Sequence, residues 1–381
     1  MIHKRFRLVI LTLTLALLMT GCWDAKDVDQ RSFVMGIAFD LAETEDRYVM
    51  TIELPVLSGF ASQSSGEGPK SVMFSTVGTS VAQMATHFES RTWRELFFGH
   101  TQAIIISGDA ARKSIRPFLD FFDRNPRIDR RLTLFISQGE AQEIFKTKDP
   151  REDLVSVYLN QMLNTLTNTA RVVKMNFQDS LRNLESNGDT ILPRVRSSGT
   201  EAVIAGGALI KDYKLIAWLG ENETRAAAIL YNNVSGGLIV VNVDDNLYAY
   251  AMRSTSSETK AKLKDNQLIF EIEVKSEGDI IEVYYEEAQG PSAFDIAKIE
   301  DKLNQLIANE ILHLVTKLQD LKTDPIGFDR LVFRSYPKFW KEHAKDWKDK
   351  IFPQAKFEIK TTFRVRRTGI VEKEVVYERQ R

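Results

Sequence analysis

The chain contains one cysteine among its 381 residues, Cys22. A single cysteine cannot form a disulfide within the chain, so the folded part must be held together by its hydrophobic core. The length permits such a core, because about 360 residues can support two or three domains. The position of the cysteine, close to the N-terminus, suggests a role in a signal sequence.

Cys22 follows a basic head and an apolar run. The head carries Lys4, Arg5 and Arg7, and the apolar run covers residues 8–19. A helix of about twelve residues is roughly 18 Å long, which is too short to cross a hydrocarbon core of ~30 Å but suits a signal peptide. The pattern predicts a lipoprotein signal peptide over residues 1–21, cleaved before Cys22.

The residues beside Cys22 fit a bacterial lipobox, with Met19 at the position that is usually Leu, followed by Thr20 and Gly21. We expect diacylglycerol and acyl chains such as palmitate on Cys22, and no other cofactor. Each buried CH₂ contributes about 0.8 kcal/mol to membrane anchoring. The alternatives are an uncleaved anchor helix or a plain secretory signal with an incidental cysteine. All three place the rest of the chain outside the cytoplasm.

The charge balance excludes one class of partner. The formal net charge is −1, and losing the signal peptide would make it more negative. We therefore expect no nucleic acid partner. No second apolar run is long enough to span a membrane.

The first half of the chain alternates strand and helix patterns. The expected strands are residues 31–40, 48–56, 72–76, 102–107 and 132–137. The first two are separated by a charged turn and predict a hairpin. Residues 57–71 are rich in Gly, Ser and Pro and predict a long exposed loop. We expect one helix over 110–124 and largely helical sequence over 151–186.

The second half begins with consecutive strands. They are expected at residues 202–210, 214–219, 237–243, 247–252, 267–276 and 280–285. Strands without intervening helices favour an antiparallel sheet. Residues 294–321 carry one apolar stripe and predict a long helix, and residues 356–367 alternate as a half-buried final strand.

These patterns predict a multi-domain α+β protein with a mixed α/β N-terminal half and a C-terminal antiparallel sheet packed against the long helix. The predicted divisions are 1–21 for the signal peptide, 22–108 for an N-terminal α/β domain, 109–199 for a largely helical middle domain and 200–381 for a C-terminal α+β domain.

No motif in the chain sets up catalysis. Five histidines lie far apart, and neither H-E-x-x-H nor a Walker A loop nor a G-x-S-x-G elbow occurs. We expect no enzyme, no metal site and no catalytic residue. His100 follows a glycine before a buried strand and is interpreted as a hydrogen-bonded residue at the strand entrance.

A cluster of aromatic residues lies near the C-terminus. Tyr336, Trp340 and Trp347 are interleaved with lysines. This mixture is typical of a helix pair packed on a core, and it is also found on partner-binding faces. We keep these three residues, and the loop over residues 57–71, as candidate contacts for a partner.

Several segments in sequence order resemble one family. They are Gly21-Cys22-Trp23-Asp24, residues 34–40, Phe98-Gly99-His100, Glu223-Thr224-Arg225, Asp324-Pro325-Ile326-Gly327-Phe328, Tyr336-Pro337-Lys338-Phe339-Trp340, Trp347, Phe352-Pro353 and Arg367-Thr368-Gly369. Together they resemble the Ger(x)C family, the C-subunit lipoproteins of nutrient germinant receptors in endospore-forming bacteria.

The resemblance implies a non-catalytic subunit, built from α+β domains, on the outer face of the spore inner membrane. It implies integral membrane partners of the A and B type, and it assigns no ligand-binding residue. Two other classes remain open at this point. A solute-binding lipoprotein that delivers a nutrient to a transporter would have two parallel-sheet lobes around a cleft. An envelope hydrolase would release cell-wall fragments.

Overall fold

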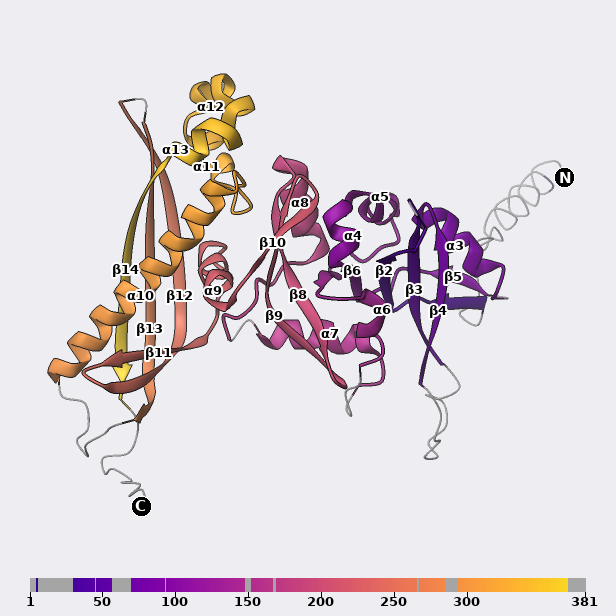
Figure 1. Cartoon of the computed structure of the whole chain (residues 1–381), viewed down its shortest axis with the longest axis horizontal. Helices are drawn as coiled ribbons and strands as arrows, with labels where there is room; N and C mark the ends of the chain where they lie inside the picture. Colours follow the sequence, from indigo (N-terminus) through magenta and orange to yellow (C-terminus); the bar gives the residue numbers. More distant parts are fainter. Residues whose placement is uncertain are drawn as a thin grey trace, which may run out of the picture.

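The computed structural model describes residues 5, 30–44, 46–56, 70–92, 94–147, 152–166, 169–265, 267–284 and 293–368. They form two bodies arranged along the long axis of the molecule (Figure 1). The first body contains an eight-stranded sheet and the second a four-stranded sheet. Cys22 and residues 57–69 of the predicted loop lie outside the described residues.

The eight-stranded sheet has the order β10-β9-β8-β7-β6-β2-β3-β4. Its strands are β2 (Gly36–Leu41), β3 (Tyr48–Pro55), β4 (Ser71–Gly78), β6 (Ala103–Ser107), β7 (Thr133–Ser137), β8 (Thr190–Ser198), β9 (Glu201–Lys211) and β10 (Lys214–Leu219). The central pairs are parallel and the outer pairs antiparallel. The predicted hairpin is confirmed as β2–β3. A separate parallel pair joins β1 (Arg31–Phe33) to β5 (Glu95–Phe97).

Helices cover both faces of this sheet, so its central strands are apolar on both sides. The helices are α3 (Val81–Glu89), α4 (Gly108–Lys113), α5 (Arg116–Arg124), α6 (Ala141–Ile144), α7 (Val155–Leu166) and α8 (Phe177–Asn187). Helices α3, α4, α5 and α8 share a core with Ile104 and Ile106, whereas α6 and α7 pack with Ile105 from the opposite face of the same strand. Phe118 of α5 stacks on Phe39 at 4.6 Å between ring centroids.

The second body is a four-stranded sheet crossed by one long helix (Figure 1). Its strands are β11 (Gly237–Val243), β12 (Asn246–Lys264), β13 (Gln267–Tyr284) and β14 (Lys356–Arg367). Helix α10 (Ala293–Asp320) confirms the predicted helix and buries Leu303, Ile307 and Ile311. Short helices follow: α11 (Phe328–Ser335), α12 (Pro337–His343), the 3₁₀ turn Ala344–Asp346, the π-turn Trp347–Ile351 and α13 (Phe352–Gln354). None of the described helices is both long and apolar enough to span a membrane.

Two sheet assignments differ from expectation. Strands β9 and β10 join the eight-stranded sheet rather than the C-terminal one, and β14 pairs with β13 in parallel. An alternating pattern identifies a strand but not its neighbour, which tertiary packing decides. The mostly polar residues 253–264 also continue β12, although only Ala261 and Leu263 among them are apolar, too few to give a strand signal.

The predicted helix over 110–124 is two helices. Ser114 is extended, with φ −179° and ψ 141°, and its hydroxyl accepts a hydrogen bond from the Arg116 N–H. Pro117 lies in the first turn of α5, where its missing N–H costs nothing. Residues 151–186 likewise contain two helices, α7 and α8, and residues 169–176 before α8 are not helical.

The predicted boundary at 108/109 falls between β6 and α4, and that at 199/200 falls between β8 and β9, which are neighbours in one sheet. As limits of domains, both stay predictions. The described residues do not form the two parallel-sheet lobes that a solute-binding lipoprotein would have.

The two bodies share a hydrophobic core. Helix α9 (Glu221–Leu230) lies between them, and its alanines pack with Leu209 and Leu219 of the first sheet. The same cluster continues to Ile311 and Leu314 of α10. The contact between the bodies is therefore built like a domain interior, and it positions the polar residues described next.

Candidate functional site

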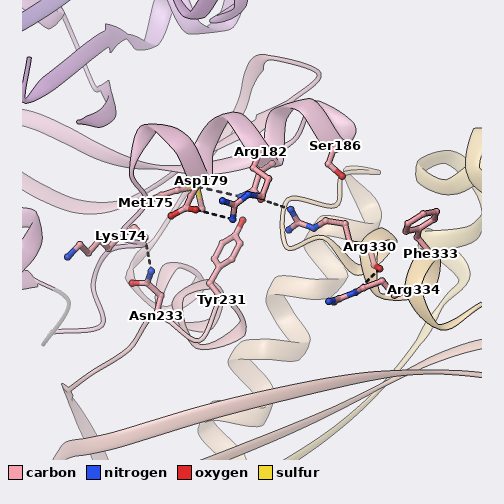
Figure 2. A pocket seen from close by; sticks show the side chains of 11 residues that line it. Lys174, Met175, Asp179, Arg182, Ser186, Tyr231, Asn233, Arg330, Phe333 and Arg334 are labelled. Carbon is pink, nitrogen blue, oxygen red and sulfur yellow. Dashed lines mark hydrogen bonds and ion pairs between the residues drawn. The ribbon is translucent and has the colours of Figure 1, made fainter. Parts of the chain in front are cut away.

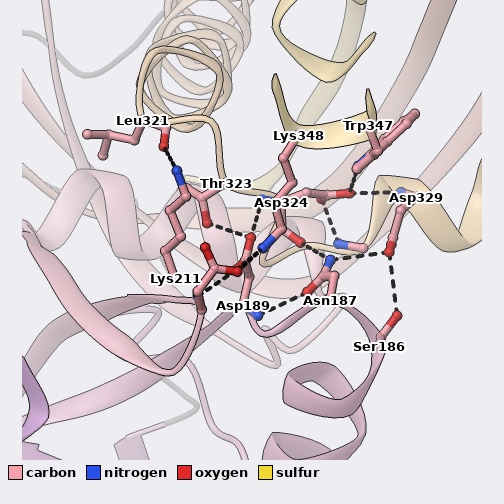
Figure 3. Close-up of polar contacts among 12 residues, drawn as sticks. Ser186, Asn187, Asp189, Lys211, Leu321, Thr323, Asp324, Asp329, Trp347 and Lys348 are labelled. Atoms are coloured by element: carbon pink, nitrogen blue, oxygen red, sulfur yellow. Dashed lines mark hydrogen bonds and ion pairs between the residues drawn. The ribbon is translucent and has the colours of Figure 1, made fainter. Parts of the chain in front are cut away.

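Where the two bodies meet, a buried carboxylate of the first body accepts hydrogen bonds from residues of the second. Asp189 follows α8 in the first body and is fully buried. It accepts hydrogen bonds from the Thr323 hydroxyl at 2.8 Å and the Asp324 N–H at 2.9 Å, both in the loop after α10 (Figure 3). A buried carboxylate left without partners would be costly, so these bonds fix the two loops together.

Lys348 supplies the positive charge for this site. Its Nζ lies 2.6 Å from Asp189 Oδ1 and 2.7 Å from Asp212 Oδ1 (Figure 3). The Asp212 N–H also donates to Asp189, at 3.1 Å. Burial alone would lower the pKa of Lys348, but the hydrogen bonds to the two aspartates outweigh it and raise the pKa. Lys348 is therefore a stable cation at neutral pH.

Asp324 opens the helix α11. Its Oδ1 accepts from the backbone N–H groups of Gly327 and Phe328, at 2.9 and 3.0 Å, and its Oδ2 accepts from that of Asp329 at 2.8 Å. Trp347 Nε1 donates to the same Oδ2 at 3.1 Å. A carboxylate at a helix N-terminus satisfies N–H groups that have no partner within the helix. The segment Asp324–Phe328 is thus a helix cap that also holds Trp347.

A second acid lies close to this cap. Burial, together with the negative charge of Asp329, raises the pKa of Asp324 to about 7, against the effect of the backbone donors. Burial also raises the pKa of Asp329. Asn187 Nδ2, from the first body, donates to Asp329 Oδ2 at 3.2 Å and to the Asp324 carbonyl at 3.0 Å. We call Asn187, Asp189, Asp212, Thr323, Asp324, Asp329, Trp347 and Lys348 the junction network.

Two glycines allow these loops to turn. Gly188 ends α8 with φ +82°, and a Cβ there would lie 3.1 Å from the Cα of Asp212. Gly327 precedes α11 with φ +87°, and a Cβ there would collide with the Arg330 guanidinium. Glycine adopts positive φ without the steric cost of other residues.

Helix α9 provides another polar contact between the bodies. Arg225 forms two hydrogen bonds with Glu310 of α10, and both side chains are largely buried. Glu223 pairs with Lys317 at 2.7 Å and caps the first turn of α9 through the Gly220 N–H at 2.8 Å. These residues belong to the segment Glu223–Arg225 noted in the sequence, so that segment also joins the two bodies.

Beside the junction network lies an open groove of about 760 Å³ (Figure 2). Helix α8 lines one side and α11 the other. Its lining residues are Lys174, Met175, Asp179, Arg182, Asn183, Ser186, Tyr231, Asn233, Arg330, Phe333 and Arg334. We call it the junction groove. Four of these residues are basic and one is acidic.

The aromatic candidates come together against the second sheet. Trp347 is 3% exposed and packs on Trp340 at 5.5 Å between ring centroids. Tyr336 accepts a hydrogen bond from the Leu263 N–H of β12 at 3.3 Å. Trp347 is thus a core residue with little surface for a partner, as the core-packing interpretation expects, while Tyr336 and Trp340 are half-buried. Partner contact by these residues stays a prediction.

Two other buried acids and one histidine could suggest catalysis, but each takes part in structural contacts. Asp40 accepts from the N–H groups of Ala141 and Gln142, and Glu53 from those of Val155 and Ser156. Both acids cap helices, and burial raises the pKa of each. The His100 ring lies against Phe33 and Phe97, at 5.3 and 5.6 Å between centroids. No group of three or more potential metal ligands occurs within the described ranges.

Comparison with known families agrees with this architecture. Residues 24–197 match the family described as "Spore germination protein N-terminal domain". Residues 205–369 match "Spore germination B3/ GerAC like, C-terminal". The chain belongs to the Ger(x)C family of spore germination proteins. The interval between the matches covers the turn from β8 to β9 and the start of β9, so the second match includes most of β9 and all of β10, which belong to the first sheet.

Curated Ger(x)C relatives cover nearly the whole chain. Spore germination protein KC of Bacillus subtilis (strain 168) is 25% identical over 96% of this chain and 97% of its own length. GerQC of Bacillus cereus is 23% identical over 95% of this chain and 99% of its own. The crystal structure of the GerBC protein has a TM-score of 0.57 with 17% identity, covering 90% of this chain and all of that one. The fold is thus shared with a solved structure.

The sequence identified some of these residues and missed others. Asp324 and Trp347 were noted as parts of separate segments, and the structure joins them. Asp189 and Lys348 were not singled out, because they are 159 residues apart and each looks like a surface charge in its own segment. The only available signal was local: Asn187-Gly188-Asp189 marks a helix end.

Proposed function

We propose that this chain is the lipid-anchored C subunit of a spore nutrient germinant receptor. Its place in the Ger(x)C family supports a role in germinant reception. The observation that carries the finer proposal is the junction network, because two of the family-like segments, Glu223–Arg225 and Asp324–Phe328, help to hold the two bodies together rather than line a reactive cleft. Such a chain acts as a rigid binding subunit and transmits a signal through contacts.

The anchor in this proposal is the lipid on Cys22. The basic head, the short apolar run and Gly21 before the cysteine support it. Diacylglycerol with a further acyl chain holds a protein more firmly than one chain does. The subunit then lies on the outer face of the spore inner membrane.

The proposal treats the subunit as non-catalytic. Asp40, Glu53, Asp189 and Asp324 are the kinds of buried acid that enzymes use, but each accepts at least two hydrogen bonds from backbone N–H groups or neighbouring side chains. Groups held this way fix loops and helix ends. The chemistry of the response then belongs to the partners, which we propose are integral membrane subunits of the A and B type.

Replacement of Cys22 tests the anchor and the role together. We expect Cys22→Ala in a sporulating host to lose membrane retention in spore fractions and to lose the nutrient response. The matched control is Gly21→Ala, which a lipobox accepts and which should change neither. Loss of retention with a normal response would leave the lipoprotein assignment standing and overturn the germination role.

The partners are tested by affinity purification from spore membranes. We expect a tagged chain to retain two integral membrane subunits after mild detergent extraction. Trp340→Ala then examines the half-buried aromatic face without removing the core residue Trp347. Unchanged recovery of both subunits with intact folding would remove Trp340 from the contact surface, and recovery of neither subunit by the wild-type chain would contradict the assembly.

A further inference from the structure

The junction groove carries an excess of positive charge. Lys174, Arg182, Arg330 and Arg334 face one acid, Asp179. Asp179 lies 3.2 Å from Arg182 and balances that residue. Lys174, Arg330 and Arg334 have no acid of their own within the lining, although Asp329 outside it lies near Arg330. Walls of protein on two sides strengthen the field of these cations relative to a flat surface.

Two hydrogen bonds fix the orientation of the Arg330 guanidinium. Its Nη1 donates to Asn183 Oδ1 at 2.7 Å and its Nη2 to the Ile326 carbonyl at 3.3 Å. The guanidinium lies against Gly327, where no side chain intervenes. A guanidinium has five N–H donors, so these two bonds leave others for a ligand. A pre-positioned planar donor loses little entropy on binding a carboxylate or phosphate.

The groove also offers apolar surface. Phe333 on α11 is 56% exposed, an unusual state for a large aromatic side chain. Met175 and Tyr231 contribute to the lining. The Tyr231 hydroxyl donates a hydrogen bond to the Pro325 carbonyl at 2.6 Å, so this polar group is already satisfied. The volume of about 760 Å³ lies within the range of small-molecule sites.

We propose that the junction groove binds a small molecule that carries a carboxylate or phosphate group together with an apolar portion. The anionic group contacts Arg330, Arg334 and Lys174, and the apolar portion packs on Phe333. Because α8 belongs to the first body and α11 to the second, one ligand touches both bodies at their junction.

Titration calorimetry on the full-length chain in detergent tests this proposal with four probes. Phenylacetate and phenyl phosphate carry both features, 2-phenylethanol lacks the charge, and inorganic phosphate lacks the apolar portion. We expect saturable binding of the first two at one site in the millimolar range or tighter. The other two should bind at least tenfold more weakly, and affinity should fall as salt is added.

Charge reversal locates the site. Lys174→Glu/Arg334→Glu should weaken both anionic probes at least tenfold. The matched control is Lys113→Glu/Lys214→Glu, two exposed lysines elsewhere on the first body, and it should bind like wild type. If the first double variant fails to fold, Arg334→Gln and Lys174→Gln, tested singly, answer the same question.

Two results would overturn the inference. One is the absence of saturable binding to either anionic probe at millimolar concentration. The other is an equal loss of affinity in the groove variant and the control, which would indicate a general charge effect. The inference does not rest on the receptor role, because it is measured on the purified chain, whereas the Cys22 experiment is read in spores.

Discussion

The junction network and the junction groove lie side by side where the end of α8 meets α11, and they use charge in opposite ways. In the network, acids from one body accept hydrogen bonds from the other, and Lys348 lies within 2.7 Å of two of them. In the groove, Lys174 and Arg334 are exposed to solvent. Buried polar groups that satisfy one another hold a structure together, while exposed charges of one sign are available to a ligand.

The family resemblance includes residues of the junction network but none of the basic residues of the junction groove. The segments that carry it include Asp324, which is hydrogen-bonded to Asp189 and Asn187 of the first body. They also include Gly327 and Trp347, which donate hydrogen bonds to the Asp324 carboxylate. None of them includes the four basic residues of the groove. The resemblance thus indicates that the contact between the two bodies is shared with the family. The ligand of the groove is inferred only from the side chains of this chain.

Removing one acid from each region gives the largest expected difference in stability between the network and the groove. Asp189→Ala leaves Lys348 and the Asp324 N–H without their buried partner, and we expect the free energy of unfolding to fall by about 3–5 kcal/mol. Asp179→Ala removes an exposed ion pair with Arg182 and an acid in the first turn of α8, and we expect a loss of about 1 kcal/mol. Urea denaturation measures both. Equal losses would mean that the network is no more structural than the groove.

The acid pair in the network predicts a dependence on pH. The pKa of Asp324 is raised to about 7 in the folded chain from an ordinary value of 3.8. Between these values the folded chain binds more protons than the unfolded one, so this carboxyl's contribution to stability falls as pH rises from about 4 to 7 and is constant above. Asp329→Asn removes the neighbouring charge and lowers the pKa of Asp324.

We therefore expect Asp329→Asn to lose less stability than wild type between pH 5 and pH 8, by on the order of 1–2 kcal/mol. Unfolding by urea at the two pH values gives the comparison. Asp179→Asn in the groove is the control and should follow wild type. A wild-type slope in Asp329→Asn would exclude the acid pair as the source.

Gly327 links the two regions, because it begins α11 and lies under the Arg330 guanidinium. Gly327→Ala should cost about 1–2 kcal/mol through positive φ and should also displace Arg330. Gly199→Ala is the matched control, since it also has positive φ but nothing lies within 4 Å of the added Cβ. A weaker affinity for phenyl phosphate in the first variant alone would tie the glycine to the groove.

The smallest expected effect on stability is at the groove rim. Arg334→Glu reverses an exposed charge in the last turn of α11, and we expect a loss of about 0.5 kcal/mol or less. Lys113→Glu makes the same change in the last turn of α4 and should cost as little. Thermal unfolding compares the two. A loss above about 2 kcal/mol in Arg334→Glu would place that residue in the structural region instead.

Periodicity in the sequence was enough to predict several elements. Residues 294–321 and 356–367 show apolar spacings of helix and strand, and both appear in the structure as α10 and β14. The mixed α+β class follows from such elements. The break at Ser114 was also available in principle, since Pro117 cannot donate a hydrogen bond within a helix.

Sheet membership and the junction could not be predicted in this way. The alternating residues 202–210 fit either sheet, and the choice depends on packing with Ile191 and Leu192 of β8. The role of Asp189 depends on its contact with the loop after α10, which lies more than 130 residues later in the chain. Contacts at that separation leave no local trace in a single sequence.

Strand β14 has a consequence for how the protein is made. It is the last described element, yet its Phe363 is fully buried and its backbone is bound by Asn304 of α10. The part of the apolar stripe of α10 that β14 covers therefore stays exposed until β14 has been synthesised, whereas α9 and β11, which also pack on α10, precede it in the chain. The four-stranded sheet of the second body likewise cannot be completed until residues 356–367 have been synthesised. Any premature stop before residue 356 would leave an exposed helix for proteases to recognise.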